Sequence, residues 1–254
     1  MSHHLRSLII KYLLVSIRNR IEKIQFSPWF SHLLIPHIRK EVYLDMWVVR
    51  PMNGQRNRLR TSILLLEILK PEFVIESGSY LGTTTQYLAG FSSKKTFSIE
   101  INKRFATVAS SRLKSEIDQE RVEIVDGNSA QQMPLILREI NPRTSKIFAY
   151  LDAHWLEQIP LFEELQALLD WGGDFIAVID DFFIPDDLGY GYDQYKNHRV
   201  DISHVPSSEK ISVWVPRESS ETESGARRGT GYVVSSNLTK QIEKESANLQ
   251  IKPY

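Results

Sequence analysis

Short apolar runs in the middle of the chain alternate with segments of helical spacing. The apolar runs predict five strands, over residues 73–76, 96–100, 121–125, 147–152 and 174–179. Apolar residues three and four positions apart predict helices over residues 56–69, from Gly82 to about Ala89, and over residues 103–117, 130–140 and 160–169. Strands that alternate with helices at this spacing indicate βαβ units and a parallel sheet.

The last fifty residues follow a different pattern. Residues 210–216 and 231–235 are strand-like, and the polar stretch between them, residues 218–229, contains no helical spacing. We therefore expect a hairpin with a long loop, so that the sheet ends in an antiparallel strand. The glutamate- and serine-rich part of this loop, residues 218–224, is expected to be mobile.

Four of the predicted strands end in acidic residues. Glu76, Glu100 and Asp152 each close a strand, and Asp180 and Asp181 follow the fifth. In open α/β sheets the ligand binds at the carboxyl ends of the strands. The sequence therefore predicts a site built from several separate loops.

Composition narrows the class of protein without deciding its function. The chain has 254 residues, of which 42% are hydrophobic and 24% charged, as in ordinary globular proteins. It has no cysteine, which excludes disulfides and thiolate metal sites. Residues 1–60 hold 11 Lys and Arg against 3 Asp and Glu, whereas residues 61–207 hold 13 against 22. The acidic excess thus belongs to the part with the strand-end carboxylates.

Residues 1–52 are predicted to form a basic helical extension in front of the domain. Within them, residues 5–24 are apolar but interrupted by Lys11, Arg18 and Arg20, which is too charged for a transmembrane span. No small-residue cleavage site follows, so a signal peptide is disfavoured and a cytoplasmic protein is expected. The helix could pack on the domain or on a second subunit of a homo-oligomer; the alternative is a peripheral contact with anionic lipid. Nucleic acid is not an expected partner, because stacking aromatics do not accompany the basic residues.

Three polar turns follow the first three strands. The first is a glycine turn from Glu76 to Gly82 that contains Gly78 and Ser79. Glu100, 24 residues after Glu76, suits hydrogen bonds to ribose hydroxyls. The third turn runs from Asp126 to Ser129 and could border an adenine. The turns do not match G-x-G-x-x-G, which argues against an NAD-linked oxidoreductase.

Together these motifs resemble those of class I S-adenosylmethionine-dependent methyltransferases, over roughly residues 55–235. The resemblance is to the group of catechol O-methyltransferase-like enzymes and the macrolide and aminocoumarin sugar O-methyltransferases. Tyr80 stands where a second glycine is common, and the same replacement occurs in the catechol O-methyltransferase-like enzymes. It implies a Rossmann-like, seven-stranded, mostly parallel sheet with the last strand antiparallel and helices on both faces, within a domain of residues 53–254. It assigns S-adenosylmethionine to one set of residues: Glu76, Gly78, Ser79, Gly82, Glu100, Asp126 and Ser129.

A second group of residues predicts a metal. Asp152, Asp180 and Asp181 would repel one another unless a cation lies between them, and Mg²⁺ prefers such oxygen ligands. Their spacing also resembles the metal site of the same O-methyltransferases. Asp152 and His154 are the candidate catalytic residues, because a histidine there could take a proton from a substrate hydroxyl. An acidic residue holds the histidine's place in the sugar-modifying relatives, so His154 could instead be a third-sphere partner of the metal or a structural histidine.

The sequence therefore predicts a Mg²⁺-assisted O-methyltransferase acting on a hydroxyl of a small molecule or of a sugar in a glycan. Residues 182–205, rich in tyrosine, aspartate and glycine, are expected to contact that substrate. One alternative is a metal-independent N- or O-methyltransferase. Another is a non-catalytic protein of the same fold that binds a partner through its basic N-terminal segment.

Overall fold

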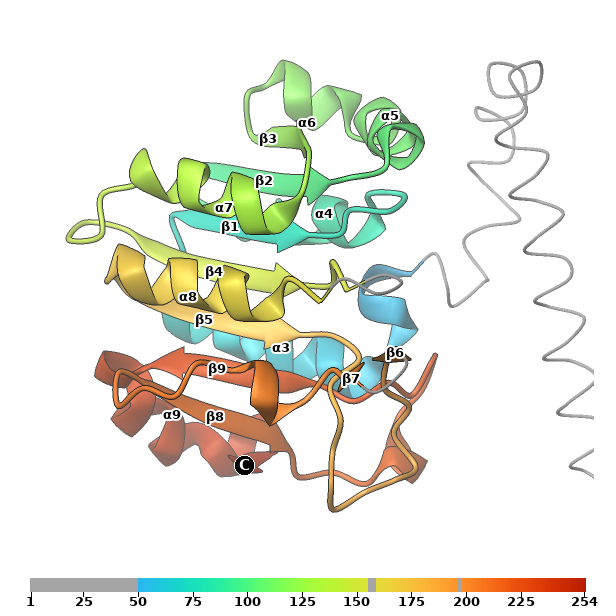
Figure 1. The fold of residues 1–254 in the computed structure, drawn as a ribbon, viewed down its shortest axis with the longest axis vertical. Helices are drawn as coiled ribbons and strands as arrows, with labels where there is room; N and C mark the ends of the chain where they lie inside the picture. Colours follow the sequence, from blue (N-terminus) through green and yellow to red (C-terminus); the bar gives the residue numbers. More distant parts are fainter. Residues whose placement is uncertain (1–49, 155–158, 196–197) are drawn as a thin grey trace, which may run out of the picture. The chain divides into compact units, whose positions relative to one another are not determined.

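A computed structural model of the chain describes residues 50–154, 159–195 and 198–254. The predicted N-terminal extension lies almost entirely outside the described residues. The described part forms one eight-stranded sheet with helices on both faces (Figure 1). The strands of this sheet are β1 (Phe73–Ser77), β2 (Lys95–Glu100), β3 (Val122–Asp126), β4 (Lys146–Leu151), β5 (Asp174–Ile179), β8 (Ile211–Pro216), β9 (Gly231–Ser235) and β10 (Ile251–Pro253).

The strands lie in the order β10-β8-β9-β5-β4-β1-β2-β3. Neighbouring strands pair in parallel along one part of this row, which consists of β5, β4, β1, β2 and β3. The pairs β5–β9, β9–β8 and β8–β10 are antiparallel. The predicted mostly parallel sheet is confirmed, but it has eight strands instead of seven. The additional strand, β10, has three residues and pairs with β8, which is too short a segment for its alternation to be read from the sequence.

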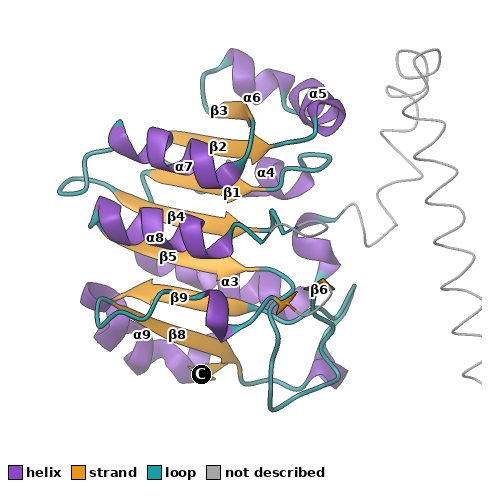
Figure 2. Cartoon of the chain, in the orientation of Figure 1, coloured by secondary structure: helices purple, strands orange, loops and turns teal. Residues whose placement is uncertain are grey.

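Helices cover both faces of the sheet (Figure 2). The apolar sides of α7 (Ser129–Arg138) and α8 (Leu161–Trp171) pack on one face. The other face is covered by α3 (Arg56–Leu69), α4 (Thr83–Leu88) and α9 (Ser236–Leu249). The predicted helix over residues 103–117 is divided into α5 (Lys103–Arg112) and α6 (Lys114–Asp118), and α9 was not predicted.

The first turn of α3 is capped by a distant segment, the capping loop of residues 218–230. Glu223 accepts hydrogen bonds from the backbone nitrogens of Asn57 (2.9 Å) and Arg58 (3.1 Å). Ser224 Oγ accepts another from Arg56 N at 3.0 Å. The first N–H groups of a helix have no partner within the helix, so a carboxylate there supplies both hydrogen bonds and a favourable charge. The stretch expected to be mobile is therefore anchored to α3.

Short elements complete the described chain. They are η2 (Pro51–Gly54), β6 (Gln194–Tyr195), β7 (His198–Arg199), η3 (Ile202–His204) and η4 (Ser220–Thr222). β6 and β7 form a separate antiparallel pair. Among the helices that the structure describes, none is both long enough and apolar enough to cross a membrane.

Candidate functional site

The acidic residues predicted to meet at one edge of the sheet do so. Backbone hydrogen bonds extend the strand pairing into the turns: Gly78 N donates to Ile99 O, Asp152 N to Ser77 O and Asp180 N to Leu151 O. The strand ends therefore form a continuous rim, in the order Asp126, Glu100, Glu76, Asp152 and Asp180. We call this row the acidic rim.

The glycine turn lies against the end of β4. Gly78 has a φ of +82°, and a Cβ there would overlap the carbonyl oxygen of Asp152. Only glycine combines this backbone conformation with so close an approach. Tyr80, at φ +47°, donates its N–H to Glu100 Oε2 at 2.8 Å, and its ring contacts Phe105 edge to face. Tyr80 thus adopts a left-handed backbone conformation. Glycine adopts this conformation most easily, which explains why it is common at this position in the related motif.

Glu76 lies buried under that turn. Ser98, its register partner on β2, donates to Glu76 Oε2 at 2.5 Å, and Thr85 donates to the same oxygen. Ser79 Oγ lies 2.6 Å from Ser98 Oγ and extends the network. Burial raises the pKa of Glu76 to about 7, with the Glu100 charge acting in the same direction and the two hydroxyls opposing it.

The remaining predicted cofactor residues lie at the ends of β1, β2 and β3. Glu100 accepts from the backbone nitrogens of Tyr80 and Asn102, both at 2.8 Å, and can accept more hydrogen bonds. Asp126 pairs with Lys103 at 3.7 Å. Ser129 is buried at the start of α7, and Gly82 precedes α4 with a φ of +73°. The structure brings all seven predicted cofactor residues to the acidic rim, to the glycine turn that follows β1 or to the start of α7.

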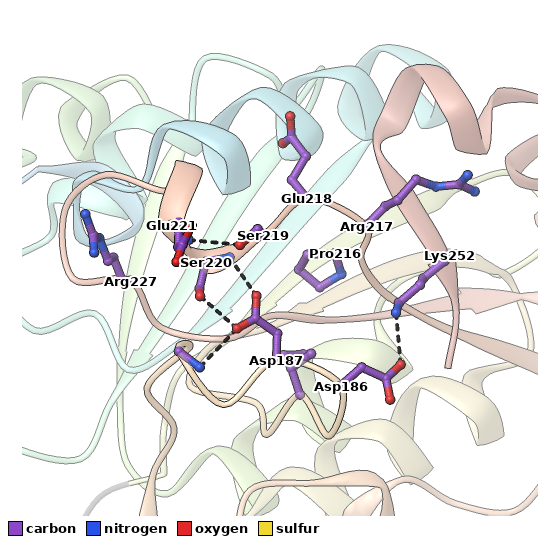
Figure 3. A pocket seen from close by; sticks show the side chains of 12 residues that line it. Asp186, Asp187, Pro216, Arg217, Glu218, Ser219, Ser220, Glu221, Arg227 and Lys252 are labelled. Carbon is purple, nitrogen blue, oxygen red and sulfur yellow. Dashed lines mark hydrogen bonds and ion pairs between the residues drawn. The ribbon is translucent and has the colours of Figure 1, made fainter.

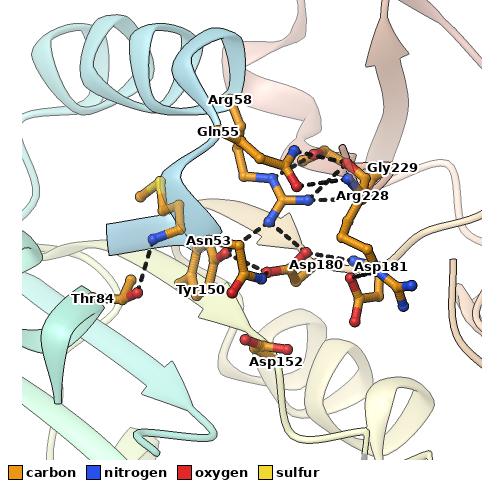
Figure 4. A network of polar contacts seen from close by, with 12 residues as sticks. Asn53, Gln55, Arg58, Thr84, Tyr150, Asp152, Asp180, Asp181, Arg228 and Gly229 are labelled. Atoms are coloured by element: carbon orange, nitrogen blue, oxygen red, sulfur yellow. Dashed lines mark hydrogen bonds and ion pairs between the residues drawn. The ribbon is translucent and has the colours of Figure 1, made fainter. Parts of the chain in front are cut away.

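Asp180, predicted as a metal ligand, lies in a network of contacts with other side chains (Figure 4). It forms a buried ion pair with Arg58; the two side chains are 0% and 1% exposed. Tyr150 Oη and Asn53 Nδ2 donate to Asp180 Oδ2 at 2.7 and 3.0 Å, and Asp181 N donates to Oδ1 at 2.7 Å. Burial would raise the pKa of Asp180, but the Arg58 charge holds it below its ordinary value.

Asp152, His154 and Asp181 form a compact group next to that network, which we call the Asp-His-Asp group. Their ligand atoms lie within 4.8 Å of one another. His154 Nε2 lies 3.9 Å from Asp152 Oδ1 and 3.9 Å from Asp181 Oδ2. The His154 side chain is buried, and its Nε2 has no hydrogen-bond partner within the described ranges. Burial, followed by the charges of Asp180 and Asp181, raises the pKa of Asp152 well above its ordinary value.

Sequence reasoning missed Arg228, the positively charged side chain beside this group. Arg228 Nε lies 2.5 Å from Asp181 Oδ1, and the same guanidinium pairs with Asp193. The Tyr195 hydroxyl lies 2.5 Å from Asp193 Oδ2 and 2.9 Å from the carbonyl oxygen of His154. Tyr195 was within the predicted substrate segment, whereas nothing in the sequence linked Arg228, 47 residues after Asp181, to it.

Another part of the predicted substrate segment lies beside a separate pocket (Figure 3). This pocket of about 570 Å³ is lined by residues of the stretches 184–189 and 216–221, together with Arg227 and Lys252. Asp187 accepts hydrogen bonds from Ser220 there, and Lys252 pairs with Asp186 at 2.9 Å. None of the predicted cofactor or metal residues lines this pocket, so we do not assign the chemistry to it.

Comparison with solved structures identifies the architecture. No family profile and no curated protein sequence matches the chain. It is similar to TomG, an O-methyltransferase from Streptomyces achromogenes involved in tomaymycin synthesis and solved with S-adenosylmethionine. The identity is 16%, the match covers 71% of this chain and 79% of TomG, and the TM-score is 0.52.

Two further matches have lower TM-scores. They are an O-methyltransferase from Bacillus cereus in complex with S-adenosylhomocysteine (16% identity, 71% of this chain and 80% of that one, TM-score 0.49) and an rRNA methylase from Streptococcus thermophilus (16%, 71% and 97%, 0.48). The fold argument rests on TomG and on the strand order. The chain therefore has the fold of the class I S-adenosylmethionine-dependent methyltransferases, as the resemblance in its sequence predicted.

Proposed function

We propose that this protein is an S-adenosylmethionine-dependent O-methyltransferase that acts on a hydroxyl of a small molecule or a sugar, with a divalent cation beside the cofactor. The contact between Gly78 and the carbonyl oxygen of Asp152 carries this proposal. This contact joins the glycine turn, where the resemblance implies that Glu76 and Gly78 line the methionine end of the cofactor, to Asp152 of the Asp-His-Asp group. The methyl donor and the acceptor hydroxyl would then meet between them, which supplies proximity.

The residues at this edge of the sheet fit both S-adenosylmethionine and a divalent cation. Glu100 retains acceptor capacity for ribose hydroxyls, and Ile101 beside it is 61% exposed, which leaves apolar surface for an adenine. The unpartnered, buried Nε2 of His154 between two carboxylates suits a cation. A bound cation would lower the pKa of the acceptor hydroxyl and fix its oxygen. With the cofactor bound, the acceptor oxygen would form a bond to the methyl carbon as the sulfonium C–S bond breaks to leave a thioether, and the hydroxyl proton would pass to water.

One alternative has a specific observation in its favour. Burial lowers the pKa of His154, so its imidazole is neutral near pH 7 and could itself accept the hydroxyl proton without a metal. Activity that persists in excess EDTA would favour this metal-independent reaction. Activity restored by divalent ions after EDTA treatment would favour the metal-assisted reaction.

Calorimetry with S-adenosylmethionine and S-adenosylhomocysteine tests the proposal at its first step. We expect both ligands to bind with micromolar or tighter affinity. Glu100→Ala should weaken this affinity at least about tenfold, because it removes roughly one charge-assisted hydrogen bond or more. Glu123→Ala is the matched control, since the exposed Glu123 lies on β3 and, among the described residues, forms an ion pair with Lys95. Absence of binding by the full wild-type chain would contradict the proposed function.

A further inference from the structure

One nitrogen of the buried imidazole in the Asp-His-Asp group, Nε2, has no hydrogen-bond partner among the described residues. Among the buried side-chain atoms of the described chain, His154 Nε2 is one of the few that lack a hydrogen bond. It nevertheless lies at the same distance, 3.9 Å, from a carboxylate oxygen of Asp152 and one of Asp181. A buried polar atom without a partner is unfavourable, so a group absent from the protein itself is expected there.

The three donors surround one common space. Donors about 2.1 Å from a metal can lie up to about 4.2 Å apart on opposite sides of it. The two separations of 3.9 Å from His154 Nε2 fall below that limit, and all three ligand atoms lie within 4.8 Å of one another, so a bound ion would draw the carboxylates inward. They are too long for direct hydrogen bonds between the imidazole and either carboxylate.

The neighbouring charges define which oxygens are available. Asp180 is occupied by Arg58, Tyr150 and Asn53. Arg228 holds Asp181 through Oδ1, which leaves Oδ2 facing His154. The Asp152 side chain is 33% exposed, so the group is reachable from solvent. The donors left are therefore one imidazole nitrogen and two carboxylates.

We propose that Asp152, His154 and Asp181 bind a first-row transition metal, of the Mn²⁺, Fe²⁺ or Co²⁺ type, in preference to Mg²⁺, while Asp180 is not a ligand. This inference rests on the proposed function and specifies which kind of divalent cation binds beside the cofactor. An imidazole nitrogen suits these ions, whereas Mg²⁺ prefers oxygen ligands alone. The affinity for N/O sites rises from Mn²⁺ through Fe²⁺ to Co²⁺. Arg228 is the positioning residue, because it fixes the carboxylate of Asp181.

Direct titration of the full chain with Co²⁺ and with Mg²⁺ tests the preference. We expect Co²⁺ to bind at least tenfold more tightly than Mg²⁺. His154→Asp, which makes the donor set all oxygen, should reverse or abolish this ratio. Loss of supporting residues alone costs metal sites roughly 10–100-fold in affinity, so His154→Ala should weaken Co²⁺ by at least that much. Equal ratios in wild type and His154→Asp would overturn the proposal.

Two controls separate this site from other histidines. His204 Nδ1 also lies 3.9 Å from an aspartate, Asp201, but has no second carboxylate described beside it, so His204→Ala should leave both affinities unchanged. His3 and His4 are adjacent in the sequence and could bind Co²⁺ themselves. All titrations are therefore performed with both of them replaced by alanine.

A spectroscopic measurement makes the result independent of how the variants fold. Pulsed electron paramagnetic resonance of the chain loaded with Mn²⁺ should show coupling to an imidazole nitrogen in a background without His3 and His4. Mn²⁺ bound without nitrogen coupling would contradict the proposal. Binding of S-adenosylmethionine is measured on the same sample: cofactor binding with a Mg²⁺ preference refutes this inference alone, whereas absent cofactor binding refutes the proposed function.

Discussion

Replacing Asp180 by asparagine should lower the free energy of unfolding of the protein. Arg58 and Asp180 are 1% and 0% exposed and form an ion pair, so Asp180→Asn leaves a buried guanidinium without its counter-charge. Breaking a buried pair from one side typically costs about 3–5 kcal/mol. The other Arg58 contacts, to Thr230, Tyr150 and the carbonyls of Arg228 and Gly229, are neutral and do not replace the charge.

Urea denaturation followed by circular dichroism measures this loss as a shift in the free energy of unfolding. Asp186→Asn is the matched control: Asp186 also pairs with a cation, Lys252, but is 71% exposed, so the change should stay below about 1 kcal/mol. Changing both partners, as Arg58→Met with Asp180→Leu, should recover much of the loss, because no unpaired charge remains. A loss below about 1 kcal/mol for Asp180→Asn, together with weaker metal binding, would refute the structural role and return Asp180 to the ligands.

Three further predictions concern other parts of the domain. Gly78→Ala should abolish cofactor binding by calorimetry, since its Cβ would overlap Asp152 O; an unchanged affinity would contradict the packing of that turn. Glu223→Ala should cost about 1–2 kcal/mol in urea denaturation through the lost cap of α3, and a loss under about 0.3 kcal/mol would mean the loop does not stabilise the helix. Burial raises the pKa of Glu164 from 4.5 to about 7, so the folded state binds the proton more tightly and wild-type stability falls as pH rises through this window. Glu164→Gln should therefore gain stability relative to wild type, by up to about 3 kcal/mol between pH 4.5 and 7; a difference independent of pH would contradict it.

The parallel part of the sheet could be predicted from the sequence because its strands are fully buried apolar runs between helices. The strand predicted over residues 174–179 has the same bounds as β5, and the helix over residues 56–69 has those of α3. The carboxyl ends of parallel strands must share an edge, so the gathering of Glu76, Glu100 and Asp152 followed from topology alone. β10 was beyond this reasoning, since three residues carry no readable period.

The different contacts of Asp152, Asp180 and Asp181 could not be predicted, because they depend on residues distant in the chain. Arg58 lies at the start of α3 and reads as one more basic residue of a helix, yet it is buried and takes Asp180 as its partner. Arg228 lies in the capping loop, where it forms an isolated β-bridge with Gly191, and it contacts one oxygen of Asp181. In the sequence, the three aspartates are equivalent carboxylates; only tertiary contacts separate the one that stabilises the fold from the two left facing His154.

A crystal structure of the full chain with S-adenosylhomocysteine and Mn²⁺, recorded with anomalous scattering, examines the shared acidic rim most directly. We predict the ribose at Glu100 and a single manganese peak among Asp152, His154 and Asp181, next to the sulfur of the cofactor. A nucleoside elsewhere, or manganese bound away from those three side chains, would contradict it.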